Sequence, residues 1–107
     1  MSNITTNNSV NDTLDVLIIG AGFTGLYQLH KLREQGFKVH LVDAAKDVGG
    51  IWHWNCYPGA RVDTHCQIYQ FSMPELWQEF EWRERFPNWE QMREYFQFVD
   101  RKLDLSR

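Results

Sequence analysis

The chain has 107 residues, of which 43% are hydrophobic and 23% are charged, and its formal net charge is −3. This length and composition predict one small globular domain, and the slight acidity argues against nucleic acid or an anionic membrane as a partner. No apolar run approaches the roughly 18 residues that a membrane span requires.

The first 13 residues form a polar stretch rich in Asn, Ser and Thr. The stretch has neither the basic region nor the apolar region of a secretion signal. We therefore expect residues 1–13 to be a disordered leader on a cytoplasmic protein, and residues 14–107 to be ordered. Cys56 and Cys66 lack the spacing of a redox or metal motif, so we expect both thiols to be reduced.

The ordered part begins with a pattern that is typical of a βαβ unit. The apolar run Leu14–Ile19 predicts a strand buried on both faces, as in a parallel sheet. Leucines at helical spacing predict a helix over residues 23–35, and Gly36 follows as a helix-ending glycine. A second strand is predicted over Phe37–Val42. The fold class is therefore α/β, a Rossmann-like dinucleotide-binding unit with an incomplete parallel sheet.

The rest of the chain is predicted to hold an irregular loop and two helices. Residues 44–72 show no good helix and cluster Gly and Pro, and a loop of that length in a compact domain is usually functional. A short helix is predicted over Pro74–Arg85. The side chains expected to face inward from it are Leu76, Trp77 and Phe80.

The last helix is predicted to begin after Asn88. Gln91 stands at the third helical position, which completes a capping-box-like pair with Asn88. The apolar stripe of this helix consists of Trp89, Met92, Phe96, Val99 and Leu103.

A glycine fingerprint, Gly20-Ala21-Gly22-Phe23-Thr24-Gly25, lies between the first strand and the first helix. Gly20 permits the tight turn, Gly22 lets a pyrophosphate approach the backbone, and Gly25 allows close packing of helix on strand. The pyrophosphate would accept hydrogen bonds from the N–H groups at the start of the helix. Asp43 ends the second strand and can accept hydrogen bonds from ribose hydroxyls. Its charge would repel a 2′-phosphate, so FAD or NAD fits this site and NADP does not.

A second motif follows the fingerprint, with Gly49-Gly50, Trp52, Tyr57-Pro58-Gly59 and Asp63 at fixed spacing. This pattern resembles the N-terminal signature of Baeyer–Villiger monooxygenases. The resemblance runs from about residue 14 to residue 105. The chain departs from the family at Cys56, where an Arg is often found, and at Asp43, where a Glu is more usual.

The resemblance implies an NADPH- and O2-dependent flavoprotein monooxygenase that converts ketones to esters or lactones through a flavin C4a-peroxide. It implies FAD and NADPH as cofactors and Asp63 as the catalytic residue, paired with an arginine from elsewhere in the full chain. Trp52 and Trp54 would shield the flavin from water. The residues that it implies as cofactor contacts are Gly20, Gly22, Phe23, Thr24, Gly25, Asp43, Gly50, Ile51, Trp52, His53, Trp54, Arg61, Val62, Asp63 and Tyr69.

Two alternatives remain beside this interpretation. One is a related flavin monooxygenase that oxidises nitrogen or sulfur, which usually lacks the second motif. The other is an inactive, truncated nucleotide-binding fragment. The two predicted strands cannot complete a doubly wound sheet, so we expect the NADPH domain and the rest of the fold to lie outside this chain. We expect the chain alone to be inactive. The four histidines lack metal-ligand spacing, so no metal site is expected.

Overall fold

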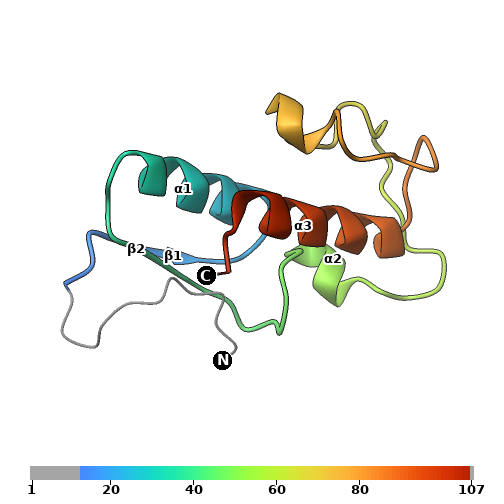
Figure 1. The fold of residues 1–107 in the computed structure, drawn as a ribbon. Coiled ribbons are helices and arrows are strands. Elements are labelled where there is room, and N and C mark those ends of the chain that lie inside the picture. Colours follow the sequence, from blue (N-terminus) through green and yellow to red (C-terminus); the bar gives the residue numbers. More distant parts are fainter. Residues whose placement is uncertain (1–12, 107) are drawn as a thin grey trace.

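The computed structural model describes residues 13–106, so the predicted leader lies almost wholly outside the described residues. Within these residues, two strands, three α-helices and one 3-10 helix follow one another (Figure 1). Their bounds are β1 (Val16–Ile19), α1 (Phe23–Glu34), β2 (Val39–Val42), α2 (Ile51–Trp54), the 3-10 helix η1 (Pro74–Leu76) and α3 (Trp89–Leu103).

The predicted βαβ unit is present, and it confirms the Rossmann-like α/β fold class. Strands β1 and β2 pair in parallel, with Val16 opposite Val39 and Ile19 opposite Val42. Both strands begin two residues later than the sequence pattern predicted. Gly36 follows α1 with a φ of +89°, the left-handed conformation that ends a helix.

The sheet is covered on one face only. Ile18 is buried and points toward Gly25 on α1. On the opposite face, Leu17 is 56% exposed and Ile19 is 78% exposed. The prediction that this strand is buried on both faces is therefore wrong for the described part of the chain, because no described element covers the second face.

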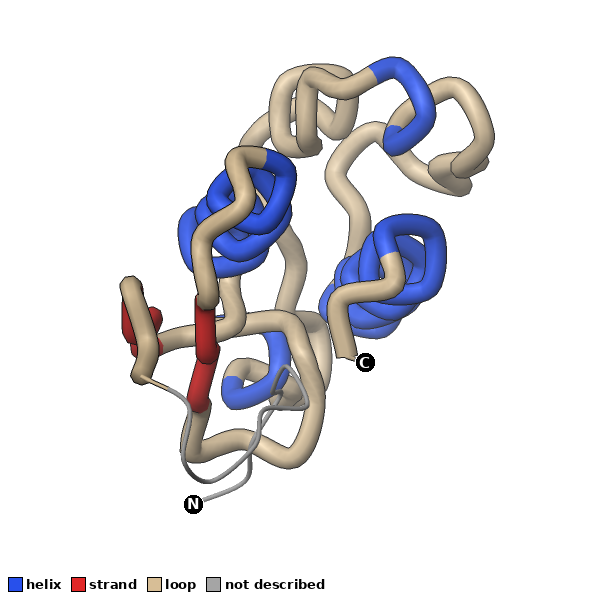
Figure 2. The backbone as a smooth tube through the Cα atoms, turned by 60° about the vertical axis from the view of Figure 1, so that its left-hand side comes forward, coloured by secondary structure: helices blue, strands red, loops and turns tan. Residues whose placement is uncertain are grey.

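Helices α1 and α3 lie side by side, and the strands lie below α1 in the view of Figure 2. The core between the helices is aromatic: the rings of Phe23 on α1 and Phe96 on α3 have their centroids 4.8 Å apart. The predicted stripe of α3 is confirmed at Met92, Phe96 and Val99, which are all fully buried. Asn88 caps the helix, since its side-chain oxygen accepts a hydrogen bond from the Gln91 backbone N–H at 2.9 Å.

The predicted helix over Pro74–Arg85 is wrong beyond its first turn, because only the 3-10 helix η1 forms there. The backbone that follows is bound by side chains from elsewhere. The buried side-chain amide of Gln91 accepts a hydrogen bond from the Arg83 backbone N–H at 3.0 Å. It also donates one to the Glu81 backbone carbonyl at 3.1 Å. Gln91 therefore does not reach back to complete a capping box. Trp77, predicted to face inward, is 42% exposed.

The stretch 44–72 is mostly irregular, as predicted, but it contains the four-residue helix α2. The pattern did not predict this turn because a single turn is too short to show helical spacing. Helix α2 packs against α3, and it lies below α3 in the view of Figure 1.

Candidate functional site: a glycine loop and its neighbouring helix

The glycine fingerprint forms the turn from β1 into α1. Gly20 has a φ of +112°, which L-residues with side chains rarely adopt. A Cβ atom added at Gly25 would come within 1.8 Å of the Gly20 carbonyl oxygen. Gly25 thus allows the close packing of helix on strand that its position predicted. Helix α1 begins at Gly22 as N-cap, without a side-chain cap and without an acidic residue in its first turn.

Asp43 ties the end of β2 to this loop. One carboxylate oxygen accepts a hydrogen bond from the Ala21 amide at 2.7 Å, and the other accepts one from the Ala45 amide at 2.7 Å. The predicted ribose ligand is therefore also the group that fixes the middle of the glycine loop.

The second motif lies directly on the first. The Gly49 amide donates to the Ala21 carbonyl at 3.0 Å. Gly50 has a φ of +57°, and a Cβ atom there would come within 2.9 Å of the Gly22 Cα. No larger residue fits at Gly50 without moving the loop, so the two motifs form one structural unit.

Three of the predicted cofactor contacts come together beside this unit. The Trp52 indole N–H donates to the Tyr69 hydroxyl at 3.2 Å, and the Tyr69 ring meets the Phe23 ring edge-on at a centroid distance of 5.2 Å. Trp52 is buried, whereas Ile51 and Trp54 are 58% and 61% exposed. Only one face of α2 is therefore held in the core.

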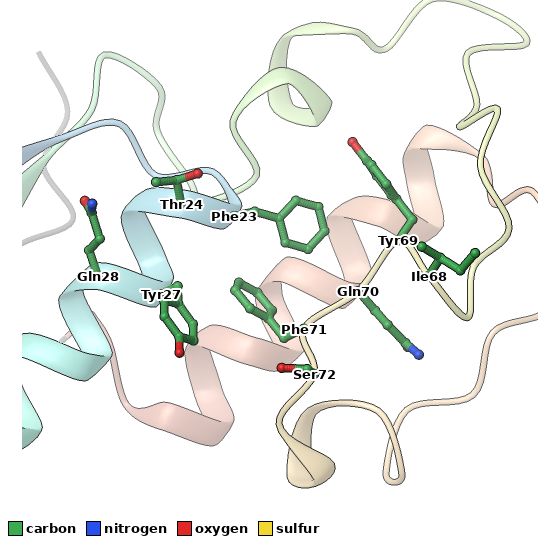
Figure 3. Close-up of a pocket in the computed structure, with 9 residues that line it drawn as sticks. All are labelled: Phe23, Thr24, Tyr27, Gln28, Ile68, Tyr69, Gln70, Phe71 and Ser72. Carbon is green, nitrogen blue, oxygen red and sulfur yellow. The ribbon is translucent and has the colours of Figure 1, made fainter.

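An open, largely apolar cavity of about 630 Å³ adjoins the loop. In Figure 3 the Phe23 ring points from the start of α1 toward Tyr69 and Phe71, which come from the irregular loop opposite. The residues that line the cavity are Phe23, Thr24, Tyr27, Gln28, Ile68, Tyr69, Gln70, Phe71 and Ser72.

The segment Arg61–Asp63 lies against residues 84–87. The Arg61 guanidinium pairs with Glu84 at 2.7 Å and donates to the Phe86 carbonyl at 2.8 Å. Val62 is buried, and its amide donates to the Pro87 carbonyl at 3.0 Å. Asp63 is exposed and accepts a hydrogen bond from the Thr64 hydroxyl at 3.3 Å. The structure thus anchors Arg61 and Val62 and leaves the Asp63 carboxylate facing outward.

Tyr95 on α3 packs against the rings of Phe23, Phe71 and Phe96. Its side chain is fully buried, and its hydroxyl accepts a hydrogen bond from the Phe71 amide at 3.0 Å. Burial raises the pKa of Tyr95 to about 12, while the hydrogen bond from Phe71 acts weakly in the other direction. The phenol therefore stays neutral and serves the packing of the site.

Sequence reasoning missed Arg93, which lies on α3. Its Nε donates to the Trp52 carbonyl at 3.0 Å, and its Nη2 donates to the His53 carbonyl. No local pattern predicts these bonds, because the acceptors are backbone atoms about forty positions earlier.

Within residues 13–106, no group of three or more His, Cys, Asp or Glu side chains is arranged to hold a metal ion. None of the described helices is long and apolar enough to cross a membrane.

A model of the NAD(P)-binding Rossmann-like domain matches residues 18–81 of the chain. The match includes the end of β1, the glycine loop, α1, β2 and α2, which are the elements that build the site.

Curated relatives are similar over nearly the whole chain. Cyclopentanone 1,2-monooxygenase from Comamonas sp. is 80% identical over 101 residues, which cover 94% of this chain and 18% of the relative. A Baeyer–Villiger monooxygenase from Pseudooceanicola batsensis is 46% identical over 98% of this chain and 20% of its own length. Phenazine N-monooxygenase from Lysobacter antibioticus is 47% identical over 87% of this chain and 18% of its own length.

A solved structure shows the same local fold. The crystal structure of OTEMO in complex with FAD and NADP superimposes with a TM-score of 0.81 and 39% identity, over 87% of this chain and 18% of that one. The chain thus spans about a fifth of the length of the proteins that it matches. Its resemblance to Baeyer–Villiger monooxygenases is confirmed by these similarities.

Proposed function

We propose that this chain, which belongs to the family of NAD(P)-binding Rossmann-like domains, forms the FAD-binding segment of a larger enzyme. That enzyme is an NADPH- and O2-dependent flavoprotein monooxygenase that converts ketones to esters or lactones. The observation that carries the proposal is the packing of Gly50 on Gly22, which joins the nucleotide fingerprint to the second motif. The 80% identity to a cyclopentanone 1,2-monooxygenase supports it.

The glycine loop suits a pyrophosphate. A Cβ atom at Gly22 would lie 3.6 Å from the Gly50 Cα, which is an ordinary contact distance. Packing within the protein therefore does not require glycine at this position, whereas close approach of a ligand does. The uncapped start of α1 supplies backbone N–H donors and a positive dipole end.

Asp43 can serve the loop and the cofactor together. Each carboxylate oxygen has two lone pairs, so the bonds from Ala21 and Ala45 leave acceptor capacity for ribose hydroxyls. The same negative charge disfavours the 2′-phosphate of NADP. FAD therefore fits this site, and NADPH would bind in a part of the protein outside this chain.

Bound FAD would supply the electron transfer and the oxygen chemistry. The residues of this chain would bind it and exclude water, with Phe23, Trp52 and Tyr69 as an apolar wall beside the loop. Asp63 would accept hydrogen bonds from an arginine supplied by another part of the protein, because its carboxylate faces outward. Arg61 would hold that segment in place through Glu84.

The proposed partners are a ketone, O2 and the remainder of a longer protein that completes the fold. The proposed location is the cytoplasm, where thiols are kept reduced. Cys56 and Cys66 are both free in the structure, in keeping with this location.

A chimera tests the proposal. This chain replaces the matching segment of the Comamonas cyclopentanone 1,2-monooxygenase, and the purified protein is assayed for flavin absorbance and for lactone formation from cyclopentanone. We expect bound FAD and NADPH-dependent lactone formation. A folded chimera that binds no FAD would overturn the proposal. The 107-residue chain alone is expected to show no turnover, and lactone formation by it would contradict its role as one segment of a larger enzyme.

Oxidation of nitrogen is the second candidate, because a phenazine N-monooxygenase is 47% identical to this chain. Product analysis of the native full-length protein with a ketone and with a phenazine separates the two. An N-oxide without any ester or lactone would favour the second candidate.

A further inference from the structure

Arg93 joins the last helix to the second motif. Its guanidinium donates from Nε to the Trp52 carbonyl at 3.0 Å and from Nη2 to the His53 carbonyl, at the end of α2. The same guanidinium lies over the Trp89 ring, with Cζ 4.8 Å from the ring centroid. One half-buried side chain on α3 is thus fixed by stacking and bound to two backbone carbonyls of α2.

These bonds supply what a four-residue helix lacks. The last carbonyls of any helix have no partner within the helix, and α2 is so short that most of its carbonyls are in this position. A cation also complements the partial negative charge at the end of a helix. The planar fork of arginine can bind two adjacent carbonyls at once, which the single ammonium of lysine cannot do in the same geometry.

The other end of α2 is fixed by the glycine loop, through the bond from Gly49 to Ala21 and the contact of Gly50 with Gly22. On its buried side, the Trp52 indole is bonded to Tyr69. Arg93 is therefore the anchor of the carboxyl end of α2.

We propose that Arg93 is a positioning residue, which sets where α2 lies against the cofactor by holding the Trp52 and His53 carbonyls. This inference rests on the proposed function, since α2 faces a cofactor only if FAD binds at the adjoining glycine loop. Without Arg93, the amino end of α2 stays fixed at the glycine loop and its carboxyl end moves. The exposed Trp54 side chain at the carboxyl end of α2 then no longer excludes water from the flavin.

The test uses the chimera described above with Arg93→Met, which keeps the apolar stem and removes the donors. Arg101→Met on the same helix is the matched control, because Arg101 is exposed. The readouts are the flavin absorbance and fluorescence spectra, the FAD dissociation constant, and the ratio of hydrogen peroxide formed to NADPH consumed. Displacement of a positioned group by about 1 Å can cost up to about 100-fold in rate. We expect Arg93→Met to raise the peroxide ratio by about tenfold and to shift the flavin spectrum. Arg101→Met should leave both unchanged.

Arg93→Lys keeps the charge and decides the matter if Arg93→Met does not fold. We expect it to melt close to the parent protein and to show a raised peroxide ratio with a shifted flavin spectrum. Parent-like spectra, FAD affinity and peroxide ratio in either folded variant would overturn the inference. Failure of the parent chimera to bind FAD would instead overturn the proposed function, so the two failures are distinguishable.

Discussion

Gly50 and Gly22 are in backbone contact: a Cβ atom added at Gly50 would lie 2.9 Å from the Gly22 Cα and 3.4 Å from the Gly22 nitrogen. The two glycines are 28 positions apart and belong to different motifs. Their contact places the second motif directly against the turn that begins α1. The two motifs, which are separate in the sequence, thus form one continuous backbone surface.

Gly50→Ala should damage this surface. The added methyl group meets backbone, which cannot move aside cheaply, and the sparsely populated backbone conformation at φ +57° adds strain of roughly 1–3 kcal/mol. We expect FAD affinity in the chimera to fall at least about tenfold, or about 1.4 kcal/mol, as measured by flavin fluorescence titration. Gly36→Ala is the control, since it has a φ of +89° with no atom within 4 Å of the added Cβ. Equal losses in both variants would show that conformational strain alone matters.

Asp43→Asn should loosen the glycine loop. The amide keeps one acceptor oxygen, so either the Ala21 or the Ala45 amide loses its partner. A buried donor left without a partner costs about 1–3 kcal/mol, and we expect FAD affinity to fall accordingly in a fluorescence titration. Asp47→Asn is the matched control, because its two oxygens accept from Val48 and Gln97 away from the loop. Unchanged FAD binding in Asp43→Asn would contradict a role for this carboxylate.

Gln91→Leu should lower stability without touching the candidate site. The substitution leaves the Glu81 carbonyl and the Arg83 amide without their partner in a partly buried region. We expect a loss of about 2–4 kcal/mol, seen as a lower thermal midpoint of the chimera. Gln97→Leu on the same helix is the control, since Gln97 is exposed and its side-chain amide donates an exposed hydrogen bond to the Asp47 carboxylate. A similar loss in both variants would contradict the bridging role of Gln91.

Tyr95 should make the domain sensitive to alkali. Its folded pKa is about 12, whereas an unfolded tyrosine has a pKa of about 10. The stabilisation is therefore fully present below about pH 10 and is lost as the pH rises toward 12, because the unfolded chain loses its proton first. The thermal midpoint of the chimera, recorded from pH 8 to 11.5, should fall above pH 10. The Tyr95→Phe substitution should reduce that fall. An equal fall in Tyr95→Phe would assign the effect to other groups.

The sequence was sufficient to predict the βαβ unit and the last helix, because their signals are local and redundant. Helical spacing indicated both long helices, Asn88 indicated where α3 begins, and Gly36 indicated where α1 ends. The helix over Pro74–Arg85 failed for the opposite reason. Its residues have helical propensity, but distant groups such as the Gln91 side chain bind its backbone in another conformation.

The candidate site was predictable at its glycines and only partly at its side chains. Gly20 and Gly25 have steric requirements that a sequence motif encodes directly. The bond between Trp52 and Tyr69 and the anchoring by Arg93 depend on tertiary packing over 17 and about 40 positions. The structural role of Asp43 also needed coordinates, because its position in the motif indicates only a ribose ligand.

Leu17→Lys should reveal whether the bare face of the sheet is covered in a longer protein. Leu17 is 56% exposed here, and exposed substitutions usually change stability by less than about 0.5 kcal/mol. The strand pattern predicted burial on both faces, and this chain spans only 18% of the Comamonas enzyme. In the chimera, a charge buried without a partner should cost several kcal/mol and lower the thermal midpoint sharply, whereas Leu17→Ile should be tolerated. An unchanged midpoint for Leu17→Lys would show that this face remains open to water, and that the strand pattern misidentified a solvent-facing side.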